Sequence, residues 1–290
     1  MRLKIILSVL LLVVFAGCTR EDTHAHKEVR LAVSSWVGYS PIHYADEKGW
    51  LKEADIDVIH STSLNETVHY FQADLIDVFV STQYEARVLN KNDLTHIMAI
   101  DRSKGGDMIL SNKPLDTILK SKKIKTYLEM DSVNELVLEG FIKKYSLSKL
   151  NFELIHKNQL NVKNINPDTQ EDIIVVTYEP YASKLKHNGF EEIASTKESD
   201  ILVLDSLYAS KEAINLHAKQ INLLKTLIKK AFDSLKNDPE EFYDTIKYTL
   251  DDQSYEDFLK SLSQIEWLVN NNNKDINKLI KHHNIIPMQE

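Results

Sequence analysis

Aromatic side chains occupy several positions where an expected β-strand ends and a helix begins. A flat ring at the mouth of a cleft can sandwich a small organic ligand or stack on a cation. The same rings could instead serve only to pack the core. We expect Trp36 and Tyr39 above all to contact a ligand. The full set is Trp36, Tyr39, Tyr84, Tyr127, Tyr178 and Tyr181.

Carboxylates follow the same expected strands, and no arginine stands at a corresponding position. Guanidinium is the natural bidentate partner of a sulfonate, phosphonate or carboxylate. Aromatic rings and carboxylates without an arginine favour a cationic, zwitterionic or neutral heteroaromatic ligand, and Asp107 would be the partner of an amine. Two alternatives stay open: backbone N–H groups could bind an anion, and Asp107 could only hydrogen-bond to the backbone. The acids are Glu85, Asp107, Glu129, Asp131 and Glu179, and the nearest arginines are Arg87 and Arg102.

Three expected helices begin at these positions, around Thr82, Ser132 and Glu179. The first turn of a helix presents unpaired N–H groups and a partial positive charge, so each start could hold an anionic group of a ligand. In the alternative, Thr82 with Glu85 and Ser132 with Glu135 form capping boxes that serve only their own helices. We include all three positions, and Gln83 beside Thr82, among the expected ligand contacts. Tyr127 and Tyr178 complete that set.

The sequence excludes several other classes of protein. The single cysteine cannot form an internal disulfide or a cysteine-based zinc site, and the histidines show no metal-ligand spacing with an acid. There is no nucleophile elbow, dinucleotide fingerprint or phosphate loop, and the chain has only seven glycines. A net charge of −8 argues against nucleic-acid binding. We therefore expect a binding protein rather than an enzyme, without a cofactor or bound metal.

The N-terminus has the pattern of a bacterial signal peptide. Arg2 and Lys4 precede an apolar run at residues 5–15, which is shorter than the roughly 20 residues a membrane-spanning helix needs. Small residues directly before Cys18 resemble a lipobox, where the thiol is lipidated and the chain is cut. We expect a signal peptide at 1–17 and a lipidated tether at 18–27, which places the protein in the cell envelope, facing the periplasm or the cell exterior. The alternatives are an uncleaved anchor, or an ordinary signal peptide with a chance cysteine.

Expected strands and helices alternate after the tether, which is typical of α/β proteins with parallel sheets. Two such series suggest two lobes with a cleft at the carboxyl ends of their strands. The expected strands lie at 29–36, 56–60, 76–80, 95–100, 107–111, 124–128, 152–156, 173–178 and 201–204. Expected helices include 40–48, 64–72 and 132–145, and the C-terminal region is helical at 216–235, 240–250, 255–269 and 275–283.

Four segments resemble the type 2 periplasmic binding proteins, and within them the nitrate/sulfonate/taurine and thiamine-precursor binding family of solute receptors. The segments are Trp36-Val37-Gly38-Tyr39-Ser40-Pro41, residues 101–107, Val176-Thr177-Tyr178-Glu179-Pro180-Tyr181, and residues 202–204 with the following helices and Asn237-Asp238-Pro239-Glu240-Glu241. The resemblance implies an α/β fold of two lobes, each a mostly parallel sheet flanked by helices, with a helical C-terminal tail. It implies a first lobe of residues 28–110 and 205–290, a second lobe of 111–204, and hinges near 109–112 and 203–205.

The resemblance also implies a function. The protein would be a lipid-anchored monomer that captures a small ligand between its lobes and delivers it to the permease of an ABC importer. The alternative is a sensor whose closed lobes switch a membrane signalling protein. The expected ligand is an amine, a zwitterion or a heteroaromatic compound such as a thiamine precursor. The alternative ligands are a sulfonate, taurine or nitrate.

Overall fold

The computed structural model describes residues 28–89, 93–198, 200–271 and 273–281. The expected signal peptide, Cys18 and the tether lie outside these ranges, so those predictions stay predictions. Within the described ranges, no helix is both long enough and apolar enough to cross a membrane.

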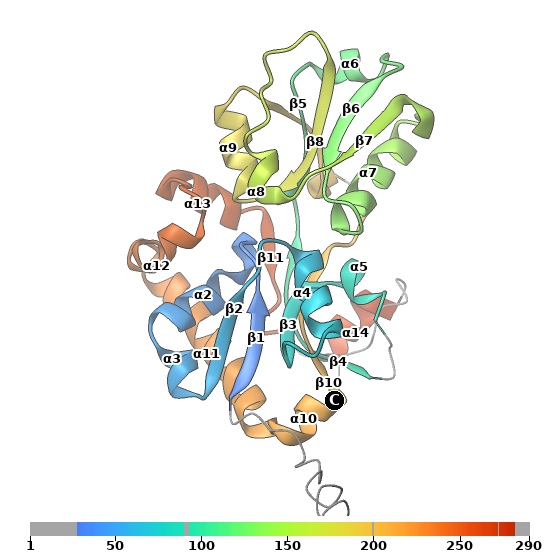
Figure 1. Ribbon diagram of the computed structural model, residues 1–290. Helices are drawn as coiled ribbons and strands as arrows, with labels where there is room; N and C mark the ends of the chain where they lie inside the picture. The colour runs from blue at the N-terminus through green and yellow to red at the C-terminus, as the bar shows by residue number, and fades with distance from the viewer. Residues whose placement is uncertain (1–27, 90–92, 199, 272, 282–290) are drawn as a thin grey trace, which may run out of the picture.

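The first lobe is built on a six-stranded sheet with the strand order β11-β4-β10-β3-β1-β2 (Figure 1). β1 runs parallel to β2 and β3, whereas β10 is antiparallel to both of its neighbours, β3 and β4, and β11 is antiparallel to β4. The carboxyl ends of β1 to β4 therefore share one edge with the start of β10. The strands are β1 (Val29–Val33), β2 (Ile56–His60), β3 (Val78–Thr82), β4 (Leu94–Ser103), β10 (Leu204–Ser210) and β11 (Ile265–Trp267).

The second lobe is built on a five-stranded sheet with the order β7-β6-β8-β5-β9. β6 is parallel to β7 and β8, and β5 is antiparallel to β8 and β9. The ends of β6 and β8 and the start of β5 face the first lobe (Figure 1). The strands are β5 (Asp107–Ser111), β6 (Ile124–Leu128), β7 (Phe152–His156), β8 (Asp172–Tyr178) and β9 (Glu191–Ser195).

Helices cover both sheets, because buried strands such as β3 have apolar side chains on both faces. The first lobe carries η1 (Val37–Tyr39), α2 (Ser40–Glu47), α3 (Trp50–Glu53), α4 (Leu64–Gln72) and α5 (Gln83–Ala86). The second carries α6 (Leu115–Ile118), α7 (Val133–Lys144), η2 (Lys149–Asn151), α8 (Gln159–Val162), α9 (Tyr181–His187) and η3 (Thr196–Glu198). The C-terminal helices are α10 (Lys211–Leu216), α11 (Ala218–Asn237), α12 (Pro239–Ile246), η4 (Lys247–Thr249), α13 (Tyr255–Leu262) and α14 (Asn273–Lys281).

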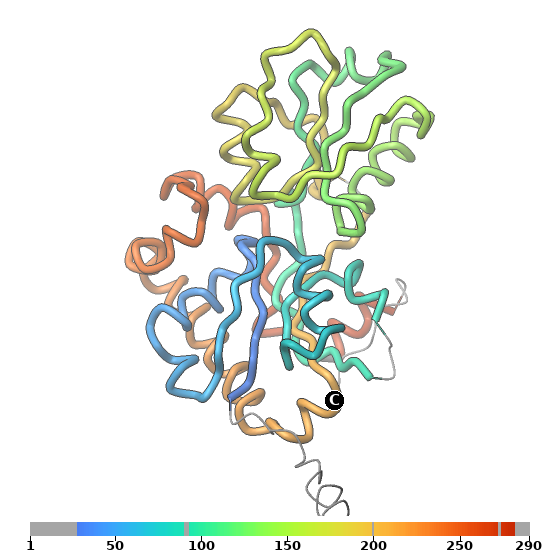
Figure 2. Tube along the Cα trace, viewed as in Figure 1, coloured from blue at the N-terminus to red at the C-terminus, as the bar shows by residue number. Residues whose placement is uncertain are grey.

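Two segments connect the lobes, around residues 105 and 200 (Figure 2). β5 pairs along its whole length with β8 and β9, so residues 107–111 belong to the second sheet. Sheet membership therefore moves the first boundary, expected after residue 110, back to about residue 106. For the same reason, residues 109–111 of the hinge expected at 109–112 lie inside β5. On the return, Leu204 already pairs with β4, which puts the second connection just before it.

The C-terminal region departs from the all-helical expectation in two places. Residues 204–210 form β10, in the middle of the first sheet. The helix expected at 255–269 ends at Leu262, and Ile265–Trp267 pairs with β4 as the edge strand β11. The salt bridges of Glu266 with Arg102 and Lys104, at 3.3 and 2.7 Å, hold this edge in place. β9 was also absent from the expected strands.

Candidate functional site

The facing strand ends of the two lobes meet around a narrow pocket that, in this closed arrangement, leaves no space for even a water-sized sphere. Small-molecule pockets usually measure roughly 300–1,000 Å³, so a ligand could enter here only if the lobes move apart. Seven residues line it: Trp36, Leu64, Thr82, Asp107, Tyr178, Val203 and Asp205. Asp107 and Tyr178 come from the second sheet, and the others come from the first lobe or its connection.

Trp36 is fixed from several sides at the end of β1. Its indole Nε1 lies 3.3 Å from each carboxylate oxygen of Asp101, and its ring meets the ring of Tyr178 edge-on at 5.9 Å. A Cβ at Gly106 would stand 2.3 Å from Cη2 of Trp36, and a Cβ at Gly38 would stand 2.1 Å from Oδ2 of Asp101. Only glycine leaves room for this contact, so the backbone of both lobes is shaped around the indole ring.

Asp205 lies at the centre of the first lobe's edge. The strand register places it beside Thr82 on β3 and beside Asp101 on β4. The hydroxyl of Tyr39 donates a short hydrogen bond to its Oδ1. Its other oxygen, Oδ2, is buried and has no hydrogen-bond partner among the described residues. Asp205 is only 1% exposed and lines the pocket, so this oxygen is a buried polar atom left without a partner where the two lobes meet.

The pocket is strongly acidic. Burial raises the pKa of Asp107 from 3.8 to about 7. Burial also raises the pKa of Asp101 and Asp205 well above the ordinary value, and the neighbouring carboxyl groups add to the effect for both. None of the described residues that line the pocket is basic. A positive charge entering the pocket would therefore be the natural counter-ion for these groups.

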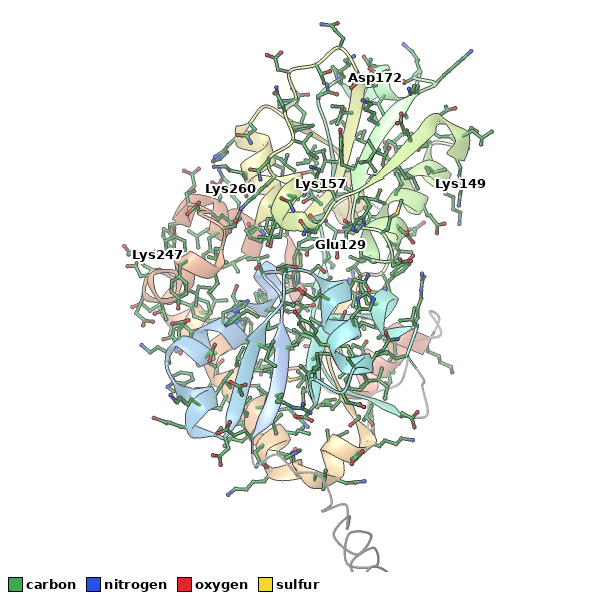
Figure 3. All side chains as sticks on the ribbon, viewed as in Figure 1. Glu129, Lys149, Lys157, Asp172, Lys247 and Lys260 are labelled. Atoms are coloured by element: carbon green, nitrogen blue, oxygen red, sulfur yellow. The ribbon has the colours of Figure 1, made fainter. Side chains whose placement is uncertain are left out.

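Glu129 adds a further acid where the two lobes meet (Figure 3). It follows β6, it is 3% exposed, and burial raises its pKa from 4.5 to about 7. The side chain of Ser63, in the first lobe, hydrogen-bonds to it and opposes part of that rise.

The two nearby arginines are engaged elsewhere. The guanidinium of Arg87 lies over the ring of Tyr84, 3.4 Å from its centroid. Arg102 forms its salt bridge with Glu266 on the outer strand β11. Neither residue lines the pocket.

The three helix starts are capped from within the chain. Thr82 accepts a hydrogen bond from the N–H of Tyr84 at 3.0 Å, and Ser132 accepts one from the N–H of Asn134 at 3.2 Å. Glu179 accepts from the N–H and hydroxyl of Ser183 at 3.1 and 2.7 Å. Thr82 and Ser132 are the N-cap residues of their helices, as in the capping alternative, whereas the N-cap residue of α9 is Pro180 and Glu179 lies just before it.

The structure gathers only part of the predicted contact set at the pocket. Trp36, Thr82, Asp107 and Tyr178 line it, and whether each touches a ligand stays a prediction. Tyr39 acts through Asp205 instead. Gln83 accepts a hydrogen bond from the N–H of Leu204 at 2.8 Å and so holds the connection between the lobes.

Tyr127, Ser132 and Glu179 lie away from the pocket lining. Tyr127 packs against an apolar cluster of the second lobe that includes Met108 and Val175. Two residues that the contact set did not include are Asp101 and Asp205. Asp101 stands in the segment 101–107 that carried the family resemblance, whereas Asp205 was expected only as part of the hinge at 203–205.

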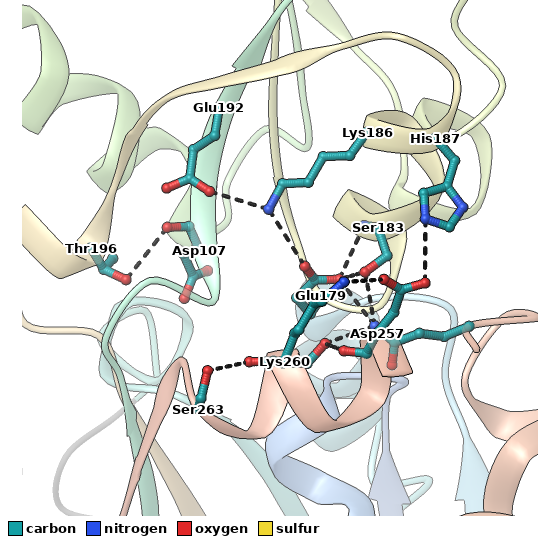
Figure 4. Close-up of polar contacts among 12 residues, drawn as sticks. Asp107, Glu179, Ser183, Lys186, His187, Glu192, Thr196, Asp257, Lys260 and Ser263 are labelled. Carbon is teal, nitrogen blue, oxygen red and sulfur yellow. Dashed lines mark hydrogen bonds and ion pairs between the residues drawn. The ribbon is translucent and has the colours of Figure 1, made fainter. Parts of the chain in front are cut away.

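A second set of contacts joins the lobes beside the pocket (Figure 4). His187 of α9 lies 3.3 Å from the Asp257 carboxylate of α13. The amide Nε2 of Gln253 donates to Glu179 at 3.2 Å and to Ser183 at 3.0 Å. With Lys163 paired to Asp251, these contacts show that the C-terminal helices of the first lobe touch the second lobe.

Within the ranges that the structure describes, no group of three or more His, Cys, Asp or Glu side chains is arranged to hold a metal ion.

The two connected lobes, each a mixed sheet flanked by helices, with a pocket between their strand ends, define the type 2 periplasmic binding protein fold. The resemblance in the sequence predicted this fold, and solved structures confirm it. The expectation that each sheet is mostly parallel was wrong, because β10 and β5 each run antiparallel to both of their neighbours. Neither a protein-family model nor a curated protein matches the chain.

Three solved structures illustrate the likeness. The periplasmic aliphatic sulphonate binding protein SsuA from Escherichia coli has a TM-score of 0.71 and 12% identity, covering 89% of this chain and 91% of that one. The alkanesulfonate-binding protein SsuA from Xanthomonas axonopodis pv. citri, bound to MOPS, has a TM-score of 0.69 and 13% identity, covering 91% and 96%. The periplasmic nitrate-binding protein NrtA from Synechocystis PCC 6803 has a TM-score of 0.57 and 12% identity, covering 76% and 66%.

Proposed function

We propose that this chain is the extracytoplasmic solute-binding component of an ABC importer, and that its ligand is a small cationic or zwitterionic amine, or a protonated heteroaromatic compound. One observation carries the choice of ligand: the unpartnered carboxylate oxygen of Asp205 is buried beside Asp107 in a pocket between the lobes. The importer role is supported by the fold and by its structural neighbours, which include sulfonate-binding and nitrate-binding proteins.

A cation is favoured over the sulfonates and nitrate that those neighbours are described as binding. An anion in this pocket would lie among buried carboxyl groups with no guanidinium or ammonium in the described lining. Each carboxylate left ionised in such a place has a high desolvation cost, which a bound ammonium group offsets. The rings of Trp36 and Tyr178 add apolar and π surface on which an alkylated or aromatic cation can rest.

The proposed mechanism is closure of the two lobes around the ligand. Asp205 belongs to the first lobe and Asp107 to the second, so one ammonium group can hydrogen-bond to both only when the lobes are closed. A ligand that gains contacts only in the closed form shifts the population toward it. The closed form is then what the permease would recognise.

The proposed location rests on the N-terminal sequence. Lipidation of Cys18 would hold the receptor at the membrane surface, and residues 18–27 would act as the tether. The receptor would be a monomer. No cofactor takes part in this function, and we propose no catalytic step.

A melting-temperature panel on the chain without residues 1–18 tests the proposal. The panel contains alkylamines, betaines, polyamines and a hydroxymethylpyrimidine, together with taurine, alkylsulfonates and nitrate. A ligand at 100 times its Kd adds about 2.7 kcal/mol to the free energy of unfolding, which raises the melting temperature by several degrees. Stabilisation by compounds that carry a positive charge supports the proposal. Stabilisation by sulfonates or nitrate alone would overturn the ligand class, and no stabilisation by any solute would overturn the receptor function.

A further inference from the structure

We infer that Glu85 is a built-in anion that occupies the start of helix α7 when the lobes close, and that it thereby makes the receptor reject anionic ligands. This inference deepens the proposed function, on which it rests, by assigning a further part of the rejection of anions to one side chain outside the pocket lining. Glu85 would determine specificity by occupying the backbone N–H that an anion would need, and it would not itself contact the bound cation.

The carboxyl group of Glu85 bridges the two lobes. Glu85 belongs to α5 of the first lobe, and its Oε1 accepts a hydrogen bond from the N–H of Val133 at 2.6 Å. Val133 is the first residue of α7 in the second lobe. The other oxygen, Oε2, accepts a short hydrogen bond from the hydroxyl of Thr82. With an exposed fraction of 2%, the Glu85 side chain is held between the lobes rather than at the surface.

The remaining N–H groups in the first turn of α7 already have partners. Those of Asn134 and Glu135 donate to the side chain and the carbonyl oxygen of Ser132, at 3.2 and 3.0 Å. The N–H of Val133 is thus the one that an incoming anion would use, and Glu85 has taken it. The partial positive charge at the start of the helix is also met by a carboxylate of the chain itself.

Glu135, at the same end of α7, does not have this role. Its carboxylate accepts from the N–H of Asp131 at 3.1 Å and from the hydroxyl of Tyr84 at 2.7 Å, and neither contact involves Val133. Replacing Glu135 removes the same formal charge from the same helix end but leaves Glu85 on Val133. It is therefore a matched control for charge alone.

The prediction is that Glu85→Ala creates an anion site. The substitution removes a negative charge, frees the N–H of Val133 and opens space beside it. A residue that only tied the lobes together would weaken closure when replaced, without any gain of affinity for anions. Anion affinity therefore separates the specificity role from a merely structural one.

The test is a titration of ¹⁵N-labelled protein, residues 19–290, with sodium nitrate and sodium ethanesulfonate, following the Val133 amide signal. We expect no saturable shift for the wild type or for Glu135→Ala. We expect a saturable shift for Glu85→Ala, with at least tenfold higher nitrate affinity. Glu85→Ser keeps a hydroxyl for Thr82 and provides the same comparison if the alanine variant does not fold.

Three outcomes would overturn the inference. If folded Glu85→Ala or Glu85→Ser gains no anion affinity while the wild type binds cations, this inference fails and the proposed function stands. If Glu135→Ala gains as much anion affinity as the Glu85 variants, the gain comes from the loss of any negative charge near this helix end and not from the position of Glu85. If the wild type itself binds nitrate or ethanesulfonate saturably at Val133, both this inference and the proposed ligand class fail.

Discussion

The indole N–H of Trp36 points at the carboxylate of Asp101, with Nε1 3.3 Å from both oxygen atoms. Asp101 belongs to β4 and Trp36 follows β1, on strands that are not neighbours in the first sheet. The contact therefore fixes the ring across the sheet edge before any ligand enters. Tyr178 of the second lobe then meets the same ring edge-on, so the ring is a contact point between the lobes.

The space around the indole ring gives the first prediction. In Gly106→Ala the new Cβ would stand 2.3 Å from Cη2 of Trp36, so the ring or the connection between the lobes must move. Overpacking of this kind costs about 1–3 kcal/mol of stability, and we expect ligand affinity to fall at least tenfold. Urea unfolding and calorimetric titration measure the two effects.

Gly49→Ala is the control for that substitution. Gly49 has a φ of +74° and nothing within 4 Å of its Cβ position, so alanine there strains the backbone without touching the pocket. It should lower stability and leave ligand affinity unchanged. Equal losses of affinity in the two variants would show that the effect at Gly106 is only general destabilisation.

The two pocket carboxylates give the second prediction. Asp205→Asn and Asp107→Asn each remove a negative charge next to the expected ammonium group. Hydrogen bonds to charged groups contribute about 1.5–3 kcal/mol, so affinity for a cationic ligand should fall about 10- to 100-fold in each variant. Asp172→Asn is the control: it removes the carboxylate at the start of β8 that pairs with Lys113, and it should leave ligand affinity unchanged. Unchanged affinity in Asp205→Asn would remove that residue from the site.

The third prediction concerns pH. Burial raises the pKa of Asp107 to about 7, above its ordinary value of 3.8, so the folded protein holds this proton over a range where the unfolded chain has lost it. Its contribution to stability is therefore fully present below pH 4 and is lost as the pH rises toward 7. Glu129, whose pKa is also raised to about 7, acts in the same direction.

The comparison of wild type with Asp107→Asn isolates this effect from the other acids. Between pH 5 and pH 7.5 the wild type should lose more stability in urea unfolding than the variant does. The affinity of the wild type for a cation should rise over the same interval, because the ionised carboxyl is the form that binds it. Identical pH profiles for the two proteins would contradict the assignment.

The fourth prediction concerns the N-terminus. In Cys18→Ser the thiol that would carry the lipid is absent, so the variant should not incorporate labelled palmitate, whereas the wild type should. Metabolic labelling of bacteria that express each form measures this. A wild type that incorporates no palmitate would support an uncleaved anchor or an ordinary signal peptide instead.

Local patterns in the sequence predicted most of the framework. β2, β5, β6 and β7 lie at the expected residues, because each is a short apolar or alternating run bounded by turn and capping residues. Helix α4 also has the expected bounds, and Ser63 caps it through a hydrogen bond from the N–H of Glu66 at 3.2 Å.

The part of the site on β10 could not be predicted in this way. Asp205 and Ser206 interrupt the apolar pattern of a strand that is buried between β3 and β4. Their burial becomes understandable only through distant partners, such as the Tyr39 hydroxyl that donates to Asp205. At Thr82 and Ser132 the capping-box pattern predicted the helix starts correctly. The sequence could not show that Glu85 would contact Val133 in the other lobe.

The most direct test of the account compares two ligands of the same carbon skeleton and opposite charge, ethylammonium and ethanesulfonate, by calorimetric titration of residues 19–290. Taurine, which carries both charged groups, completes the series. If the buried carboxyl groups select a cation, ethylammonium binds measurably, more weakly in Asp205→Asn, and ethanesulfonate does not bind. Binding of ethanesulfonate without binding of ethylammonium would contradict that selection.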